Sequence, residues 1–247
     1  MREAVIVSTA RTPIGKAFRG AFNDTQAQEM AGHAIAEAVK RSKVSKEEID
    51  DVIIGAAGQQ GSQQGNIARQ SLLRAGLPVS VAGMSLDRQC ASGMMAIATA
   101  AKEITEDGMT ITVGGGVESV SLVRNENFRM DRARDPWLEE NIPSLYMTMI
   151  ETAENVAKRY DISREAQDEY SLQSQMRTAR AQQNGYMDKE IVPLKSTMKY
   201  KDKETGEISS HDVCIEKDEG NRPSTTFEGL SALKPVFKDG ILSLIHI

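Results

Sequence analysis

Strand-like and helix-like segments alternate along the first 118 residues of this 247-residue chain, and this alternation limits its possible folds most strongly. Short apolar runs predict buried strands, at 4–8, 51–55, 84–86 and 109–113. Apolar residues at helical spacing predict helices, at 25–42, 67–73 and 90–106, the first with Asp24 as its N-cap. Strands that alternate with helices form βαβ units, and helices on both faces of a parallel sheet explain why its strands are apolar throughout. The sequence therefore predicts an α/β core over residues 1–118.

The character of the chain changes after Ser119. Residues 123–141 are rich in Arg, Asn, Asp and Glu, and helical patterns follow at 151–160 and 163–183. The second of these has Ser163 as a predicted N-cap and Asn184–Gly185 as its end. Two polar β-like runs then flank 204–206, which predicts a hairpin. We interpret residues 119–238 as an α+β insertion into the α/β fold.

Composition restricts the class of protein. A chain that is 40% hydrophobic and 26% charged can build one large or two small cores. No stretch approaches the roughly 18 apolar residues of a membrane span, and a net charge of −5 disfavours a nucleic-acid surface. The two cysteines, Cys90 and Cys214, share no spacing pattern, so a disulfide framework is not expected. These features predict a cytoplasmic protein with no membrane and no nucleic-acid partner.

Cys90 occupies the turn between a predicted strand and a predicted helix, and the small residues Ala91, Ser92 and Gly93 follow it. The N-terminus of a helix offers unpaired N–H groups and the positive end of its dipole, and both stabilise a thiolate. Small neighbours allow a substrate or another backbone segment to come close. The local sequence is equally compatible with a nucleophilic cysteine and with a buried structural cysteine that opens a core helix.

Further motifs accompany the cysteine in a fixed order. They are Arg11–Lys16, Gln64–Gln70, Ala75–Pro78, Cys90–Gly93, Gly114–Ser119, Thr152–Ala157, Ser163–Tyr170 and Leu233–Pro235. In that order and at those intervals, the chain resembles the N-terminal part of a thiolase, an acyl-CoA:acyl-CoA C-acyltransferase, up to about residue 238. The resemblance implies a thiolase-like βαβ half with an inserted loop domain at 119–238, a region that carries much of the coenzyme A site and contributes to oligomerisation.

The resemblance also implies roles for three residues. Cys90 is expected to carry the acyl group as a thioester, in thiolysis of a 3-oxoacyl-CoA or in the reverse Claisen condensation. Arg222 matches an arginine near the coenzyme A nucleotide, and Met149 matches a methionine that lines the acyl pocket. Many acetoacetyl-type thiolases have a histidine before that methionine, whereas this chain has Thr148. Coenzyme A thioesters are the implied substrates, with no bound cofactor, and the full-length parent is expected to be a homodimer or homotetramer.

The resemblance stops after about residue 238, and residues 239–247 are expected to be an unrelated tail. A full thiolase has a second α/β half with a Gly-His-Pro histidine and a second active-site cysteine, and this half is expected to be absent. The chain would then be an incomplete and inactive fragment. Two alternatives stay open: a β-ketoacyl synthase-like condensing enzyme, which shares the cysteine-at-helix design, and a non-catalytic binding fragment.

Other residues are not expected to take part in the chemistry. His33 lies in a predicted helix, His211 in a polar stretch and His246 in the tail, and Cys214 lies in an alternating strand with no base beside it. These residues show no zinc-ligand spacing, so no metal site is expected. Gly114–Gly116 is not a phosphate-binding loop, because the sequence there has neither the Gly-x-Gly-x-x-Gly pattern nor the Lys-Ser/Thr pair that completes such a loop. We interpret these glycines as the end of a strand where backbones come close beside the Cys90 turn.

Overall fold

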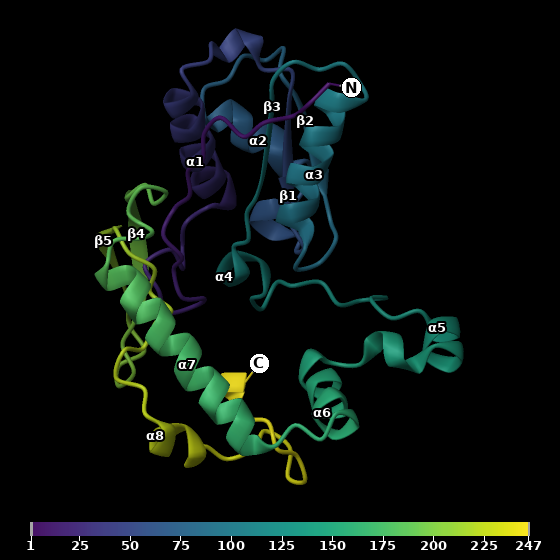
Figure 1. The fold of residues 1–247 in the computed structure, drawn as a ribbon, viewed down its shortest axis with the longest axis vertical. Helices are drawn as coiled ribbons and strands as arrows, with labels where there is room; N and C mark the ends of the chain where they lie inside the picture. The colour runs from purple at the N-terminus through teal and green to yellow at the C-terminus, as the bar shows by residue number, and fades with distance from the viewer. Residues whose placement is uncertain (1, 247) are drawn as a thin grey trace. The chain divides into compact units, whose positions relative to one another are not determined.

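A computed structural model describes residues 2–246. The chain forms two compact units (Figure 1). The first unit contains the residues up to Phe128 together with Lys189–Gly220, and the second contains Arg129–Asp188 together with the residues from Asn221 onward. The predicted division into segments 1–118, 119–238 and 239–247 is based on the family resemblance and stays a prediction.

A parallel sheet forms the centre of the first unit. Its strands are β1 (Asp51–Gly55), β2 (Ala82–Leu86) and β3 (Thr112–Gly116), in the order β2-β1-β3. All three strands end in register, because Gly55 pairs with Leu86 on one side and with Gly116 on the other. The carboxyl ends of the strands therefore meet along one edge of the sheet, where the functional loops of α/β proteins lie.

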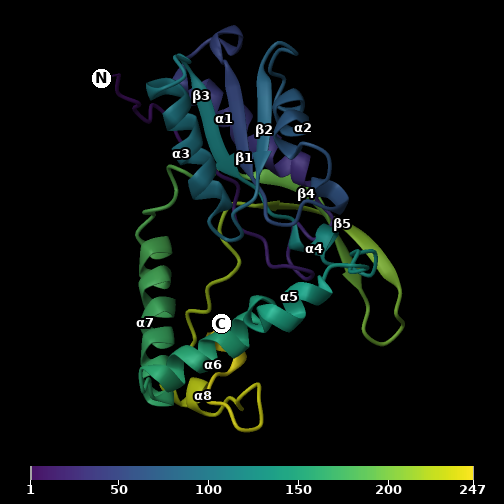
Figure 2. The same cartoon turned by 90° about the vertical axis from the view of Figure 1, so that its right-hand side faces the viewer.

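Helices cover both faces of this sheet. Val52 and Ile54 of β1 pack into a cluster with α1 (Ala27–Ser42) and α2 (Ile67–Arg74), whereas Ile53 packs against α3 (Ser92–Thr105). Figures 1 and 2 show α1 and α2 on one side of the strands and α3 on the other. This alternation buries β1 completely and confirms the predicted α/β class with a parallel sheet.

The predicted strand at 4–8 is wrong. These residues form no strand, and the side chains of Val5, Ile6 and Val7 are 73%, 78% and 68% exposed. Within residues 2–246 this segment lies in neither sheet, and an apolar run without a ladder partner gains neither backbone hydrogen bonds nor burial from extended geometry. The first backbone pairing of the N-terminal segment is at Arg11, whose N–H donates to Glu190 O at 2.9 Å.

Several predicted boundaries shift, three of them in α1, α3 and β3. α1 begins two residues late with Gln26 at its N-cap, so the prediction for Asp24 is wrong: its carboxylate pairs with Lys199 Nζ at 3.0 Å. α3 begins at Ser92 rather than at Cys90. β3 lies three residues later than predicted, because Asp50 Oδ2 accepts from the N–H groups of Thr110 and Ile111 and holds them before the strand.

The first unit also contains the predicted hairpin, with strands β4 (Leu194–Lys201) and β5 (Ile208–Ile215) in antiparallel pairing. Its turn is built by Asp202, whose Oδ1 accepts from the N–H groups of Glu204 and Thr205 at 2.9 and 2.7 Å. Gly206 has φ +74°, a conformation that glycine adopts without strain. The short helix α4 (Val120–Val123) and the 3-10 turns η1 (Lys46–Glu48) and η2 (Gly61–Gln63) complete this unit.

The second unit is mainly helical. It contains α5 (Pro136–Asn141), η3 (Pro143–Tyr146), α6 (Met149–Arg159), α7 (Arg164–Gln183), α8 (Phe227–Ser231) and η4 (Leu244–His246). Ser163 caps α7 as predicted, because its Oγ accepts from Ala166 N at 3.2 Å, and Gly185 follows the helix with φ +68°. Residues 241 and 242 pack here through their N–H groups, each 2.9 Å from Glu154 Oε1. Among the described residues, no helix is long and apolar enough to cross a membrane.

Arg11 joins the N-terminal segment to residues on both sides of the hairpin, Glu190 before it and Asp218 after it. Its Nε donates to Glu190 Oε1 at 2.7 Å, and its Nη1 and Nη2 donate to the two carboxylate oxygens of Asp218 at 2.7 and 3.0 Å. Asp218 also accepts from Ile14 N at 2.8 Å. Burial raises the pKa of Asp218, but the hydrogen bonds from Arg11 and Ile14 outweigh this effect, so its pKa lies below the ordinary value of 3.8.

This ion pair predicts a pH-dependent stability. A carboxyl group with a depressed folded-state pKa contributes stability above its unfolded pKa, and the contribution is lost as the pH falls through the folded pKa. We expect the difference in urea midpoint between the wild type and Asp218→Asn to be constant above about pH 5 and to shrink below about pH 4. Urea titrations between pH 3 and pH 7 measure it, with Asp212→Asn as the exposed control. A gap that is as large at pH 3 as at pH 7 would contradict the assignment.

Candidate active site

The Cys90 turn connects β2 to α3 at the edge where the three strands end. Ser92 organises this turn: its Oγ accepts from Arg88 N at 2.8 Å and donates to Gln89 O at 2.6 Å. Gln89 has φ 50°, which turns the backbone back towards the helix, and Asp87 Oδ1 accepts from its N–H at 2.7 Å. The turn is therefore fixed from both sides, and the Cys90 thiol it carries is free and exposed.

Exposure distinguishes between the two interpretations of Cys90. A structural cysteine would be buried in the core, whereas this thiol is open to solvent two residues before the first residue of α3. The first N–H groups of a helix have no partner within it, and the helix dipole adds a positive potential there. This position leaves the thiol accessible to a substrate, which agrees with the nucleophilic interpretation.

Glycines bring α3 directly against the sheet. A Cβ atom built on Gly55 would lie 2.2 Å from the carbonyl carbon of Ser92, and one on Gly114 would lie 2.8 Å from Ile97 Cα. On Gly116, it would lie 3.0 Å from Gly93 Cα. The interpretation of the triple glycine as a site of close backbone approach is confirmed. These glycines are the last three residues of β3, at the end of a strand as predicted.

The other two predicted site residues lie in the second unit. Met149 is the first residue of α6, and its side chain is 71% exposed. Arg222 is exposed, and its backbone N–H donates to Gln175 Oε1 of α7 at 2.8 Å. Gln175 also accepts from Asn221 Nδ2 at 2.9 Å, so α7 holds the backbone at Arg222 while the guanidinium extends into solvent.

The histidines and the second cysteine have structural contacts or surface positions. His33 Nε2 lies 3.0 Å from Pro193 O, His211 Nε2 lies 2.9 Å from Ser209 Oγ, and His246 Nε2 lies 2.8 Å from Asp168 Oδ1. Cys214 is an exposed residue of β5. Among residues 2–246, no group of three or more His, Cys, Asp or Glu side chains could hold a metal ion.

Two carboxyl groups with raised pKa values, Glu103 and Asp51, lie towards the opposite end of the sheet. Burial raises the pKa of Glu103, and the nearby charges of Asp51 and Asp107 raise it further. Burial also raises the pKa of Asp51, the first residue of β1. The Cys90 turn lies beside the last residue of β1, so these acids do not serve the thiol.

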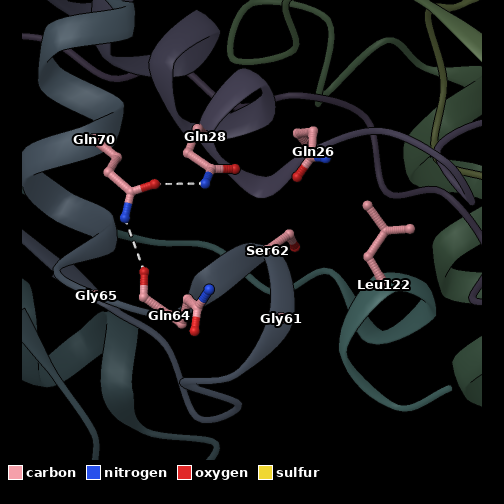
Figure 3. A pocket seen from close by; sticks show the side chains of 8 residues that line it. All are labelled: Gln26, Gln28, Gly61, Ser62, Gln64, Gly65, Gln70 and Leu122. Atoms are coloured by element: carbon pink, nitrogen blue, oxygen red, sulfur yellow. Dashed lines mark hydrogen bonds between the residues drawn. The ribbon is translucent and has the colours of Figure 1, made fainter. Parts of the chain in front are cut away.

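A cavity of about 600 Å³ lies elsewhere in the first unit (Figure 3). Its lining consists of neutral residues: Gln26, Gln28, Gly61, Ser62, Gln64, Gly65, Gln70 and Leu122. Gln28 Nε2 donates to Gln70 Oε1 at 2.7 Å, and Gln70 Nε2 donates to Gln64 O at 2.8 Å. Gln28 and Gln70 thus bind to each other, and Cys90 is not part of the lining, so we do not assign this cavity to the candidate site.

Two residues near the candidate site escaped sequence reasoning. Gln63 and Glu118 connect the loops that follow β1 and β3, through hydrogen bonds between segments 55 residues apart. Glu118 lies within the Gly114–Ser119 motif, which was the only signal available for it. Nothing in the sequence around Gln63 distinguishes it from the neighbouring glutamines.

Comparison with known proteins identifies the family of the chain. The sequence matches the family described as the thiolase N-terminal domain over residues 4–242. It is 38% identical to a 3-ketoacyl-CoA thiolase of Bacillus subtilis, over 98% of this chain and 62% of the relative. It is 38% identical to a beta-ketoadipyl-CoA thiolase of Pseudomonas putida, over 96% of this chain and 60% of the relative. It is 36% identical to a peroxisomal 3-ketoacyl-CoA thiolase B of Mus musculus, over 96% of this chain and 54% of the relative.

These matches cover nearly all of the chain, which itself spans about 60% of the length of the first two of these curated relatives. They confirm the resemblance on which the sequence-based interpretation rests, and they agree with the α/β fold of the first unit. The chain belongs to the thiolase family and carries its N-terminal domain.

Proposed function

We propose that this chain belongs to a CoA-dependent acyltransferase and that Cys90 is its nucleophile. The observation that carries the proposal is the exposed thiol in a rigid turn, directly before a helix and at the carboxyl edge of a parallel sheet. The names of the relatives, 3-ketoacyl-CoA thiolase and beta-ketoadipyl-CoA thiolase, agree with such chemistry.

The proposed thiolysis has two steps: the acyl group is transferred first to Cys90 and then to coenzyme A. The Cys90 thiolate adds to the 3-oxo carbonyl carbon of a 3-oxoacyl-CoA, the C2–C3 bond breaks, and C2 takes up a proton as acetyl-CoA leaves. The thiol of coenzyme A then attacks the Cys90 thioester, so that a new acyl-CoA forms and the cysteine returns to its free state. Condensation is the same sequence in reverse. Within residues 2–246 each histidine has the contact described above, so we assign no base for the proton at C2.

Arg222 and Met149 are the proposed substrate-binding residues. Coenzyme A is a polyanion, and a protein with a net charge of −5 needs a local cation to bind it. Arg222 is exposed and held at its backbone by α7, which suits contact with the nucleotide phosphates. Met149 would line the acyl chain. We further propose a homo-oligomer in the cytoplasm as the setting of the reaction.

Protection of the thiol tests this proposal. Desulfo-coenzyme A lacks the reactive thiol, so it can occupy the site without consuming an alkylating reagent. We expect a saturating concentration to slow carboxamidomethylation of Cys90 by about fivefold or more, and to leave Cys214 unaffected. Peptide mass spectrometry after timed exposure to iodoacetamide gives both rates. Equal rates at Cys90 with and without the ligand would contradict the proposal.

The same assay tests Arg222. Arg222→Ala removes a charge-assisted contact to phosphate, so the concentration needed for half-protection of Cys90 should rise by roughly tenfold. Arg177→Ala is the matched control, because it removes an exposed arginine from the same unit without altering the Asn221–Arg222 segment. If both variants shift the half-protection point equally, the effect is one of overall charge and the assignment of Arg222 fails.

A further inference from the structure

Glu118 and Gln63 form a polar brace between the loops that flank the Cys90 turn. Gln63 is 1% exposed, and its Nε2 donates to Glu118 Oε1 at 2.7 Å and to Gly58 O at 2.8 Å. Its Oε1 accepts from Ser119 N. The amide of Gln63 thus uses both of its ends to connect the loop after β1 with the segment after β3.

The carboxylate of Glu118 holds the loop after β1. Its Oε2 accepts from Ala57 N at 2.9 Å, and Gly58 N lies 3.3 Å from Oε1. Hydrogen bonds to an ionised acceptor are stronger than those between neutral groups. Residues 57 and 58 directly follow β1, so this anchor fixes the direction in which the chain leaves the sheet.

Backbone contacts connect that loop to the Cys90 turn. Ala56 N donates to Leu86 O at 3.0 Å, and Leu86 is the last residue of β2 before the turn. Val117 N donates to Gly55 O at 3.0 Å, and Gly55 packs against the backbone of Ser92. A displacement of residues 56–58 therefore reaches the first turn of α3 through main-chain atoms alone, without flexible side chains to absorb it.

We propose that Glu118 and Gln63 are positioning residues for the Cys90 thiol. They do not touch the reacting atoms; they fix the loops on either side of the turn so that the thiol keeps its place at the N-terminus of α3. The proposal rests on the proposed role of Cys90 as the nucleophile. It names the side chains that hold the site rigid.

The two cysteines of the chain provide a probe and an internal reference. Both thiols are exposed, so iodoacetamide reaches both, and peptide mass spectrometry gives a rate for each. In Glu118→Gln, an amide N–H₂ group replaces one acceptor oxygen. This donor faces the N–H group of Ala57 or of Gln63, which also donate, so a hydrogen bond of the brace is lost. We expect carboxamidomethylation of Cys90 to slow by about fivefold or more, with the rate at Cys214 unchanged.

The sign of the change separates positioning from simple electrostatics. Loss of a negative charge near a thiol favours the thiolate and would speed its alkylation. Glu118→Asp keeps the charge but shortens the side chain, so under our proposal it also slows the reaction at Cys90. If Glu118→Gln does not fold, Glu118→Asp takes its place in the test. Glu126→Gln is the matched control, because it removes an exposed carboxylate from the same unit, and it should leave both rates unchanged.

An unchanged or faster reaction at Cys90 in both Glu118 variants overturns the proposal. So does equal slowing at Cys90 and Cys214, because it would indicate a general loss of structure. Failure of the proposed function gives a different result: desulfo-coenzyme A would not protect Cys90 in the wild-type chain, whatever the Glu118 variants do.

Discussion

In the full-length parent, Cys90→Ser is expected to abolish the acetyl adduct that we expect Cys90 to form with acetyl-CoA, with a loss of about 10³-fold or more. A serine hydroxyl is almost the same size as a thiol but does not ionise near neutral pH, so the nucleophile disappears while the turn is preserved. Intact-mass and peptide mass spectrometry measure the adduct, and circular dichroism checks the fold.

Cys214→Ser is the control for this experiment. It removes the other exposed thiol of the first unit and should leave the adduct at its wild-type level. An adduct that persists in Cys90→Ser, or that maps to Cys214 in the wild type, would show that the assigned nucleophile is wrong.

Gly55→Ala should produce the largest loss of stability of any methyl-sized change at the edge of the sheet. The added Cβ would lie 2.2 Å from the carbonyl carbon of Ser92, and the atoms that must move belong to the backbone of α3. We expect the free energy of unfolding to fall by about 3 kcal/mol or more, as in severe overpacking. Urea unfolding followed by circular dichroism measures the change.

Gly220→Ala is the matched control for this substitution. A Cβ built there meets no atom within 4 Å, and the residue is not among the glycines with positive φ. Its effect on stability should stay within about 0.5 kcal/mol. Similar losses in the two variants would show that the approach of α3 to the sheet is not what makes Gly55 necessary.

Elements with complete local signals could be predicted from the sequence. β1 lies at its predicted residues because a short apolar run bounded by polar residues is sufficient for a buried central strand. The predicted limits of α7 agree closely because Ser163 and Gly185 act within one turn of its ends. The hairpin follows from Asp202 and Gly206 in the same way.

Elements that depend on distant partners could not be predicted in this way. The apolar run at 4–8 has the composition of a strand, but strand formation needs a neighbour, and no local pattern reports one. Asp24 has the chemistry of an N-cap, yet Lys199, far away in the sequence, pairs with its carboxylate.

In the candidate site, too, the parts set by local sequence could be predicted and the parts set by distant contacts could not. The position of the Cys90 turn follows from local sequence, because a strand, a small-residue turn and a helix are contiguous there. The brace of Glu118 and Gln63 depends on the meeting of two loops in space, which periodicity does not encode. The assignments of Met149 and Arg222 rest on the resemblance and stay predictions, because both residues lie in the other unit.

The close approach of α3 to the sheet has a consequence for how this fold can vary. The approach of α3 to the sheet is set by contacts between main-chain atoms at Gly55, Gly93 and Gly116, not by the shapes of interlocking side chains. A library that randomises side chains around the turn but keeps Ser92, Gln63 and Glu118 would therefore retain many members with the cysteine in register, whereas one that varies Gly55 and Gly116 would lose nearly all of them. Diversity in substrate preference can accumulate around such a centre while the centre itself stays fixed.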